Sequence, residues 1–308
     1  GQGAWRSGPI NVILNGGPVP RRRTGHNEEP RCSRVRLQTG YLVPLAPGLG
    51  VTPLRSAPGF KPTGLLIDLD GTLIDQESRM AARVEHAVRL AAQRVPVAIA
   101  SGREPDDVAR FARLLGLTHP QIADNGARII DPVTGATVHE RPMPEGDARR
   151  IVQQLGQERL RYYAVDAGRV ARAIAEFTEW RVTVIAAHAV TRGVCQRLLA
   201  TLSAGEAQGV ASTDAGGGYW YANFTRKGVS KGYGAREFAR MTGAALSGIV
   251  AVGDSENDLP MFAEVGMPVA MGHARPEVKA AARAVVAPLG EDGLAEAIER
   301  FVLTPPGR

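Results

Sequence analysis

The stretch Leu65-Leu66-Ile67-Asp68-Leu69-Asp70-Gly71-Thr72 places two carboxylates directly behind a short apolar run. Such a run, stopped by a glycine, predicts a buried β-strand that ends in a turn. Side chains alternate along a strand, so we expect Asp68 and Asp70 to point the same way at its carboxyl end, where open α/β sheets bind ligands. Two like charges this close favour a bound divalent cation. Magnesium takes carboxylate and carbonyl oxygens and is usually completed by a substrate phosphate.

Composition separates a basic tail from a charge-balanced body. The chain has 308 residues, 44% of them hydrophobic, which is enough for one large domain or two smaller ones. The formal net charge of +6 belongs to residues 1–60, which hold 8 Arg and 2 Glu, while residues 61–308 hold 29 Lys and Arg against 29 Asp and Glu. We therefore expect no nucleic acid partner for the body. Residues 1–60, rich in Gly, Pro and Arg, are predicted to be a disordered extension, with a nucleic-acid or acidic-lipid arm as the alternative.

The cysteines and apolar runs bear on compartment. Cys32 and Cys195 give neither a disulfide framework nor a metal-ligand spacing, so a reducing, cytoplasmic compartment is expected. No stretch approaches about 18 continuous apolar residues, because the best candidate, 41–54, is interrupted by prolines and glycines. The start lacks a basic region followed by an apolar stretch. Neither a membrane span nor a secretory signal is expected.

From Pro62 onward, short apolar runs alternate with amphipathic stretches. Alternation of strand and helix predicts a parallel sheet built from βαβ units. We expect strands at 65–69, 96–100, 121–123, 248–252 and 267–271, and helices at 81–92, 106–115, 232–242 and 259–264. The predicted fold class is therefore α/β, with one doubly wound, Rossmann-like sheet assembled from residues 61–141 and 226–308.

The middle of the chain, residues 142–225, has a different pattern and is predicted to be an inserted α+β domain. It combines two expected helices, at 146–157 and 189–203, with β-like runs at 181–186, 209–212 and 219–224. Alternation in the last run puts Tyr219, Tyr221 and Asn223 on one face and Trp220 and Phe224 on the other. A core face opposite an exposed face explains this arrangement, and an aromatic wall of a binding site is the alternative.

Three further polar features follow predicted strands. Ser101 and Gly102 lie between a strand and a helix, where a hydroxyl and a backbone N–H can hold a phosphate oxygen, although Ser101 could instead cap the helix. Lys231 opens a helix, and its ammonium can neutralise a phosphoryl group together with the aspartates, with Lys227 as its rival.

The third feature is Gly253-Asp254-Ser255-Glu256-Asn257-Asp258, which follows a predicted strand. Asp254 and Asp258 can add ligands to a cation held by the first two aspartates. Helix capping by Asp254 and Ser255 is the alternative. Capping alone does not explain why four acids would converge.

In this order, the motifs resemble the haloacid dehalogenase (HAD) superfamily, in its Cof-like or IIB branch, in which a C2-type cap is inserted into the core. The resemblance covers residues 62–303. It rests on Asp68-x-Asp70-Gly71-Thr72, Ser101-Gly102-Arg103, Lys231-Gly232, Gly253-Asp254-x-x-Asn257-Asp258 and, before the cap, Asp124-Asn125-Gly126-Ala127. At Gly272-His273-Ala274 the chain departs from the branch, which more often has Asn before the Ala, and the role of His273 stays open.

The resemblance implies a phosphatase that uses Mg²⁺ to hydrolyse a small phosphate monoester, such as a sugar phosphate, through an aspartyl-phosphate intermediate. Asp68 is then the nucleophile and Asp70 the general acid and base. The implied metal ligands are Asp68, the Asp70 backbone carbonyl and Asp254, with Asp258 acting indirectly. The implied phosphate-binding groups are Leu69, Ser101, Gly102, Lys231 and Asn257, and Arg103 and Asn125 are candidate substrate contacts.

Two alternatives stay open for the same site. A phosphomutase of the superfamily would use the same residues but return the phosphoryl group to its substrate, and nothing in the sequence decides between the two reactions. A catalytically inactive relative could use the pocket to bind phosphorylated ligands. The expected partner is in each case a small-molecule phosphate ester, with no membrane, and the sequence does not indicate the oligomeric state.

Overall fold

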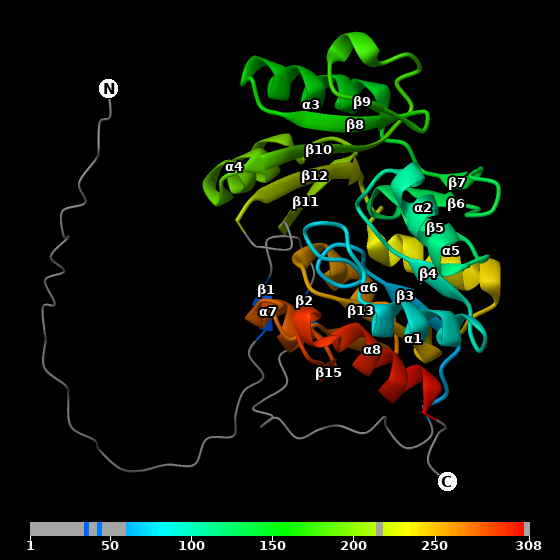
Figure 1. Cartoon of the computed structure of the whole chain (residues 1–308). Helices are drawn as coiled ribbons and strands as arrows, with labels where there is room; N and C mark the ends of the chain where they lie inside the picture. Colours follow the sequence, from blue (N-terminus) through cyan, green and yellow to red (C-terminus); the bar gives the residue numbers. More distant parts are fainter. Residues whose placement is uncertain (1–33, 37–41, 45–59, 214–217, 305–308) are drawn as a thin grey trace, which may run out of the picture.

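The computed structural model describes residues 60–213 and 218–304, together with the backbone of residues 34–36 and 42–44. In this part of the chain, five parallel strands form a central sheet in the order β15-β14-β13-β3-β4 (Figure 1). Their bounds are β3 Gly64–Ile67, β4 Val97–Ile99, β13 Ile249–Gly253, β14 Met267–Ala270 and β15 Ala284–Val285. The strands come from both ends of the predicted core, so the α/β fold class is confirmed.

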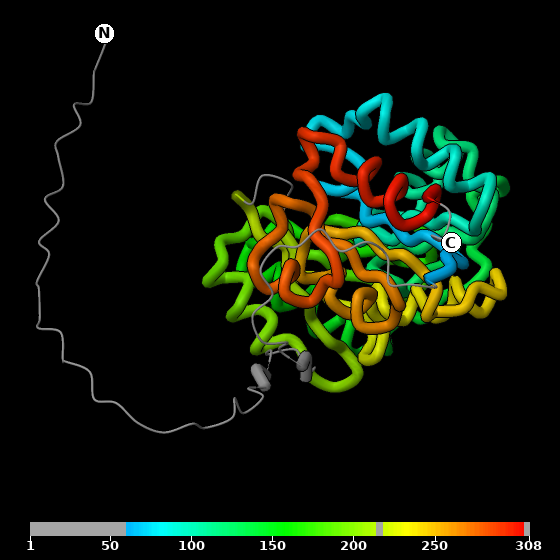
Figure 2. Tube along the Cα trace, turned by 90° about the horizontal axis from the view of Figure 1, so that it is seen from below, coloured from blue at the N-terminus to red at the C-terminus, as the bar shows by residue number. Residues whose placement is uncertain are grey.

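Helices cover both faces of this sheet because strand side chains alternate. Leu65 and Ile67 of β3 pack on one side with helices α1, α2 and α8, whereas Leu66 packs on the other side with α5, α6 and α7. The helices are α1 Ala82–Ala92, α2 Pro105–Leu115, α5 Lys231–Thr242, α6 Leu259–Phe262, α7 Pro276–Ala281 and α8 Gly293–Ile298. Seen from below in Figure 2, the C-terminal segment (red) lies against α1 (cyan), and Arg83 pairs with Glu299 at 2.8 Å.

A small antiparallel sheet leads from the core toward the insertion. It consists of β5 Gln121–Ala123, β6 Arg128–Ile130 and β7 Thr137–Glu140. A parallel bridge between Ala100 and Ile122 aligns β5 with the end of β4. The turn between β5 and β6, η1 Asp124–Gly126, therefore lies beside the carboxyl end of the central sheet.

The insertion, which we call the cap, is an antiparallel sheet with two helices. The strand order is β11-β12-β10-β8-β9. Its elements are α3 Glu145–Gln157, β8 Tyr162–Asp166, β9 Arg169–Ala171, β10 Val182–Val190, α4 Arg192–Leu202, β11 Ala207–Thr213 and β12 Trp220–Arg226. Helices α3 and α4 bury one face of this sheet, and Figure 1 shows the sheet between these helices and the core. The opposite face therefore looks toward the central sheet.

Short 3-10 or π segments complete the described elements: η2 Ile174–Glu176, η3 Leu246–Gly248, η4 Glu256–Asp258, η5 Leu289–Glu291 and η6 Glu299–Leu303. The predicted helix at 189–203 was wrong at its start, because Ala189 and Val190 still belong to β10. The helix begins only after Thr191, whose side chain accepts a hydrogen bond from the backbone N–H of Val194. Strands β6 to β9 were not predicted.

Two short strands lie within the predicted extension. Most of the predicted extension 1–60 lies outside the described residues, but β1 Arg34–Arg36 and β2 Leu42–Pro44 pair as antiparallel strands within it. The boundaries at 141/142 and 225/226 stay a proposal. In the described part of the chain, no helix is long and apolar enough to cross a membrane.

Candidate active site

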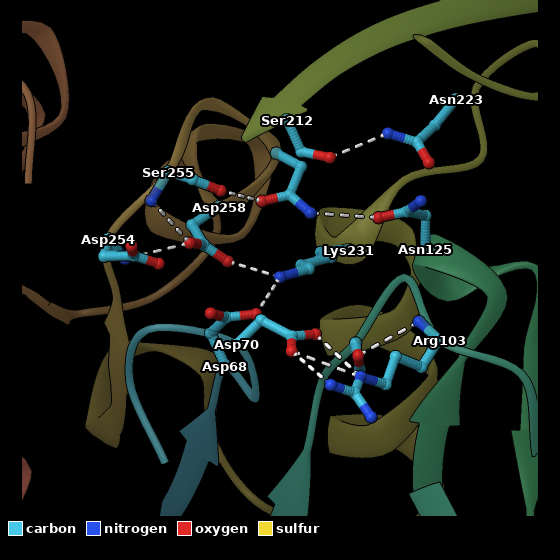
Figure 3. A network of polar contacts seen from close by, with 12 residues as sticks. Asp68, Asp70, Arg103, Asn125, Ser212, Asn223, Lys231, Asp254, Ser255 and Asp258 are labelled. Carbon is cyan, nitrogen blue, oxygen red and sulfur yellow. Dashed lines mark hydrogen bonds and ion pairs between the residues drawn. The ribbon is translucent and has the colours of Figure 1, made fainter. Parts of the chain in front are cut away.

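Three carboxylates and one ammonium group meet at the carboxyl end of the central sheet (Figure 3). Asp68 directly follows β3, Asp254 directly follows β13, and Asp258 ends η4. One oxygen of each carboxylate lies within 4.8 Å of the others. Lys231, in the first turn of α5, donates hydrogen bonds to Oδ1 of Asp68 and, at 2.6 Å, to Oδ1 of Asp258. The sequence motifs predicted at separate strand ends are thus brought together.

Local backbone features make this convergence possible. Gly71 has a φ of +84°, and a Cβ atom at this position would lie 2.5 Å from Oδ2 of Asp254. Only glycine combines this left-handed backbone with room for the neighbouring carboxylate. In the next loop, Oδ2 of Asp258 accepts hydrogen bonds from the backbone N–H groups of Asp254 and Ser255, at 3.0 Å each. The turn thereby fixes Asp258 while leaving its Oδ1 for Lys231.

Helix capping and a contribution to the carboxylate cluster both apply to the loop 253–258. Ser255 caps η4 in a capping box with Asp258, which is the alternative that the sequence raised for Ser255. Asp254 and Asp258 nevertheless point into the same cluster as Asp68. Ser101, in contrast, does not cap α2, since Glu104 holds that position and Ser101 Oγ accepts from the N–H of Arg103 at 3.0 Å.

The cluster carries more negative than positive charge. Burial and the neighbouring Asp258 raise the pKa of Asp68 well above its usual value, although Lys231 opposes this effect. Burial also raises the pKa of Asp258, and the two aspartates raise the pKa of Lys231. A buried oxygen of Asp254, Oδ1, has no hydrogen-bond partner among the described residues. An all-oxygen donor set with a buried, unpartnered carboxylate oxygen fits a hard divalent cation such as Mg²⁺.

The second aspartate of the motif, Asp70, is held by Arg103. The guanidinium group approaches both carboxylate oxygens, with Nη2 2.6 Å from Oδ1 and Nε 3.0 Å from Oδ2. Its Nη1 donates to Asp107 at 3.1 Å. Asp68 and Asp70 line the same cavity, as expected, although Asp70 lies in the turn after β3 rather than on the strand. Arg103, predicted as a substrate contact, therefore pairs with Asp70, the predicted general acid and base.

Several groups near the two aspartates can donate hydrogen bonds to a phosphate. The backbone N–H groups of Leu69 and Gly102 donate to no acceptor among the described residues. Asn257 accepts from Ser255 Oγ at 2.5 Å and donates to Oδ1 of Asn125 at 3.2 Å. Asn125 is 2% exposed, and its Nδ2 has no partner in the same part of the chain. Most of the predicted phosphate-binding and substrate-contacting groups line one space, and the ones outside its lining are Leu69, Asn125 and Lys231.

That space is a cavity of about 460 Å³ between core and cap. Its core side includes Asp68, Asp70, Ser101, Gly102, Arg103 and Asn257, all of which the sequence predicted as site residues. The cap contributes Tyr163, Arg172, Ser212, Thr213, Tyr221 and Asn223. A volume near the lower end of the range for ligand pockets suits a small substrate.

The sequence favoured an exposed face for Tyr219, Tyr221 and Asn223, with the wall of a binding site as the alternative. Tyr219 is exposed, but the other two residues lie on the cavity wall. The predicted alternation is confirmed, because Trp220 and Phe224 are buried in the cap core while Tyr221 and Asn223 line the cavity. Tyr163 and Arg172 were missed, since no strand was predicted around them. An apolar run followed by Asp166-Ala167-Gly168 was the available signal for a β-hairpin.

Of the two candidate lysines, only Lys231 lies in the carboxylate cluster, and His273 lies beside it. Lys227 is exposed, whereas Lys231 is 1% exposed within the carboxylate cluster. His273 Nε2 lies 3.4 Å from Oδ2 of Asp254, and its Nδ1 accepts from the backbone N–H of Leu289 at 3.3 Å. His273 thus contacts the predicted metal ligand rather than Asp70.

Comparison with known proteins decides the family. The sequence model of the haloacid dehalogenase-like hydrolases matches residues 65–181 and 190–298. The chain belongs to this family. A phosphoglycolate phosphatase of Halorubrum lacusprofundi is 32% identical over 231 residues, covering 75% of this chain and 93% of that protein. A putative phosphatase of Bacillus subtilis is 28% identical over 254 residues, covering 78% of this chain and 97% of the relative.

Solved structures agree on the fold. A HAD subclass IIB sugar phosphatase has a TM-score of 0.66 at 22% identity, with 79% of this chain and 100% of that chain covered. This HAD hydrolase therefore has the Cof-like architecture that the motifs indicated, and the relatives named above are phosphatases. The roles of its individual site residues are inferred from the geometry above.

Proposed function

We propose that this HAD phosphatase hydrolyses a small phosphate monoester with the help of Mg²⁺, through an aspartyl-phosphate on Asp68. The observation that carries the proposal is the cluster of Asp68, Asp254 and Asp258 around a single Lys231. One ammonium group cannot balance three carboxylates and an incoming phosphate. A divalent cation supplies the missing charge.

Asp68, Asp254 and the backbone carbonyl of Asp70 would hold the Mg²⁺ ion, with Asp258 acting indirectly because both its oxygens already accept hydrogen bonds. When bound, the ion offsets the repulsion between carboxylate and phosphate and polarises the phosphoryl group. The N–H groups of Leu69 and Gly102, the Ser101 hydroxyl, Lys231 and Asn257 would hold the non-bridging phosphate oxygens.

The reaction then needs two displacements at phosphorus. A carboxylate oxygen of Asp68 forms a bond to phosphorus, the bond between phosphorus and the ester oxygen breaks, and Asp70 gives its proton to the departing alcohol. Asp70 next takes a proton from a water molecule whose oxygen attacks phosphorus. The bond to Asp68 breaks, and inorganic phosphate leaves.

The size and polarity of the cavity support a small, polar alcohol part. Relatives named phosphoglycolate phosphatases and a structural neighbour named a sugar phosphatase make phosphoglycolate and sugar phosphates the first esters to test. A phosphomutase would rephosphorylate its product instead of releasing phosphate.

The test is phosphate release from a panel of phosphoglycolate, hexose phosphates and p-nitrophenyl phosphate, with Mg²⁺ or with EDTA. We expect release with at least one ester, only with Mg²⁺, and none from Asp68→Asn. Asp106→Asn, the same change at an exposed residue in the first turn of α2, is the matched control and should keep full activity. Release by Asp68→Asn at the native rate, or release that EDTA leaves unchanged, contradicts the proposal.

A further inference from the structure

One face of the cap sheet looks into the cavity, and strand register decides which side chains lie on it. Ala186 of β10 pairs with Tyr163 of β8 on one side and with Asn223 of β12 on the other. Tyr163 and Asn223 both line the cavity, whereas the next residues, Ala164 and Phe224, are buried in the cap core. The cavity face of the cap sheet therefore presents polar side chains on both sides of the buried Ala186.

The same register places Arg172 on this face. Ala171, the last residue of β9, pairs with Ala164, so Arg172 follows at the position opposite Tyr163. Ala171 is buried in the cap core, and Arg172 lines the cavity. The backbone N–H of Arg172 donates to the Glu176 carboxylate at 2.7 Å, which holds the end of the strand in place. A fixed backbone with an extended side chain suits ligand recognition.

Arg172 also differs from the other guanidinium group of the cavity. Arg103 donates to Asp70 and Asp107, whereas the Arg172 side chain has no hydrogen-bond or ion-pair partner in the described part of the chain. Its charge acts on Glu104, which lines the cavity, and on His188. Burial raises the pKa of Glu104, which Arg172 opposes, and burial lowers the pKa of His188, to which Arg172 contributes. Among the described residues, Arg172 is thus a cation on the cavity wall that no carboxylate contacts directly.

We propose that Arg172 binds a carboxylate on the alcohol part of the substrate, which makes the preferred substrate a small phosphate ester of a hydroxy acid. A planar guanidinium group pairs with a carboxylate through two parallel hydrogen bonds. One guanidinium balances one carboxylate, whereas a second phosphate would bring up to two negative charges close to Glu104 and Asp107. The inference rests on the proposed phosphatase activity and adds its substrate class.

The test compares two esters of similar size that differ in one charge. Phosphoglycolate carries the carboxylate, and 2-hydroxyethyl phosphate has a neutral hydroxymethyl group in its place. We expect the wild-type enzyme to favour phosphoglycolate in kcat/KM. Arg172→Gln should lower kcat/KM for phosphoglycolate about 10- to 100-fold, as expected for a lost charged hydrogen bond, and leave the neutral ester within about 3-fold. Arg172→Lys keeps the charge but loses the paired donors of the guanidinium group, so its kcat/KM for phosphoglycolate should lie between those of the wild type and Arg172→Gln.

The matched control is Arg169→Gln. Arg169 is exposed, begins β9 three residues before Arg172, and by strand alternation points to the opposite face of the sheet. The Arg169→Gln variant should leave kcat/KM unchanged for both esters. Glycolate should inhibit the wild-type enzyme more strongly than Arg172→Gln, a readout that loss of folding alone does not produce.

Several outcomes would overturn the inference. Equal losses for both esters in Arg172→Gln mean that Arg172 has a structural role. A wild-type preference for the neutral ester, or for a bisphosphate ester of a diol, means that the cavity recognises hydroxyl groups or a second phosphate. Each of these results leaves the phosphatase proposal intact, because phosphate is still released. No release from any ester overturns both.

Discussion

The guanidinium group of Arg103 donates to both oxygens of the Asp70 carboxylate, with Nη2 2.6 Å from one oxygen and Nε 3.0 Å from the other. Paired contacts of this kind fix the orientation of a carboxylate as well as its charge. In the mechanism proposed above, the same carboxylate must carry a proton to the departing alcohol. Arg103 therefore aims the group that performs the proton transfer.

Asp70→Asn keeps one oxygen that Arg103 can contact, so we expect the fold to persist. The variant cannot give a proton to the leaving alcohol, and kcat for an alkyl phosphate should fall about 10²- to 10⁴-fold. The first step with p-nitrophenyl phosphate should suffer far less, because nitrophenolate leaves without a proton. Burst kinetics with the two esters measure this contrast. Equal losses in the first step would show that Asp70 has another role.

Lys231 is the buried cation of the carboxylate cluster, 1% exposed. Lys231→Met leaves the aspartates without their partner, so we expect the free energy of unfolding to drop by about 3–5 kcal/mol. Activity should fall at least about 100-fold. Added Mg²⁺ should restore part of the stability, because the cation binds the same carboxylates. Urea unfolding with and without Mg²⁺ measures both effects. Lys227→Met, at an exposed position, is the control, and an equal loss there would refute the assignment.

Tyr163 connects the cap to the turn of Ser101 and Gly102, which we propose to bind phosphate, since its hydroxyl donates to the backbone carbonyl of Gly102 at 3.2 Å. Tyr163→Phe removes this bond and should lower kcat/KM about 5- to 10-fold, the effect of one hydrogen bond. The unfolding free energy should change less, because the bond links two sheets rather than filling a core. Steady-state kinetics and urea unfolding test the contrast. Unchanged kinetics with a clear loss of stability would contradict it.

The turn that carries Asn125 holds a buried ion pair between Asp124 and Arg128, and a hydrogen bond links this pair to the cap. Asp124 accepts from Arg128 Nε at 3.1 Å and from the hydroxyl of Thr183, on the cap strand β10, at 2.6 Å. Burial raises the pKa of Asp124 to about 6. Between about pH 4 and this value, the folded protein keeps a proton that the unfolded chain has lost. This group's contribution to stability must therefore decrease as the pH rises through that window.

The expected decrease is about 3 kcal/mol between pH 4 and pH 7, and Asp124→Asn should abolish it. Groups with lowered pKa values, such as Asp166, give the opposite slope in both proteins. The difference between wild type and variant in urea unfolding at several pH values isolates Asp124. A difference that stays constant with pH would rule out this titration.

The core of the site could be predicted because its groups follow strands that the local sequence defines. Apolar runs ending at Asp68, Ser101 and Asp254 fix three strand ends, and parallel strands bring these ends to one edge. Lys231 follows from its position at the start of a helix that returns to the sheet. The loop after β13 both caps the helix η4 and supplies carboxylates to the cluster. The sequence alone could not show that both roles apply.

The cap wall could not be predicted in the same way. Arg172 lies on the cavity face only because β9 pairs with β8 and the whole cap packs over the core, and both relations involve residues distant in sequence. The ion pair of Asp124 and Arg128 depends on Thr183 in the same manner. Substrate selection is therefore the part of the function that needed the structure.

In the proposed reaction, Asp68 becomes phosphorylated during turnover. The direct measurement is to quench the reaction of Asp70→Asn with p-nitrophenyl phosphate in acid, because this ester needs no proton for its first step, to reduce the protein with borohydride, and to examine the peptides by mass spectrometry. An acyl phosphate is reduced to a homoserine residue, and we predict homoserine at position 68 only when both ester and Mg²⁺ were present. Phosphate release without any modification at Asp68, or modification at another carboxylate, would contradict the account.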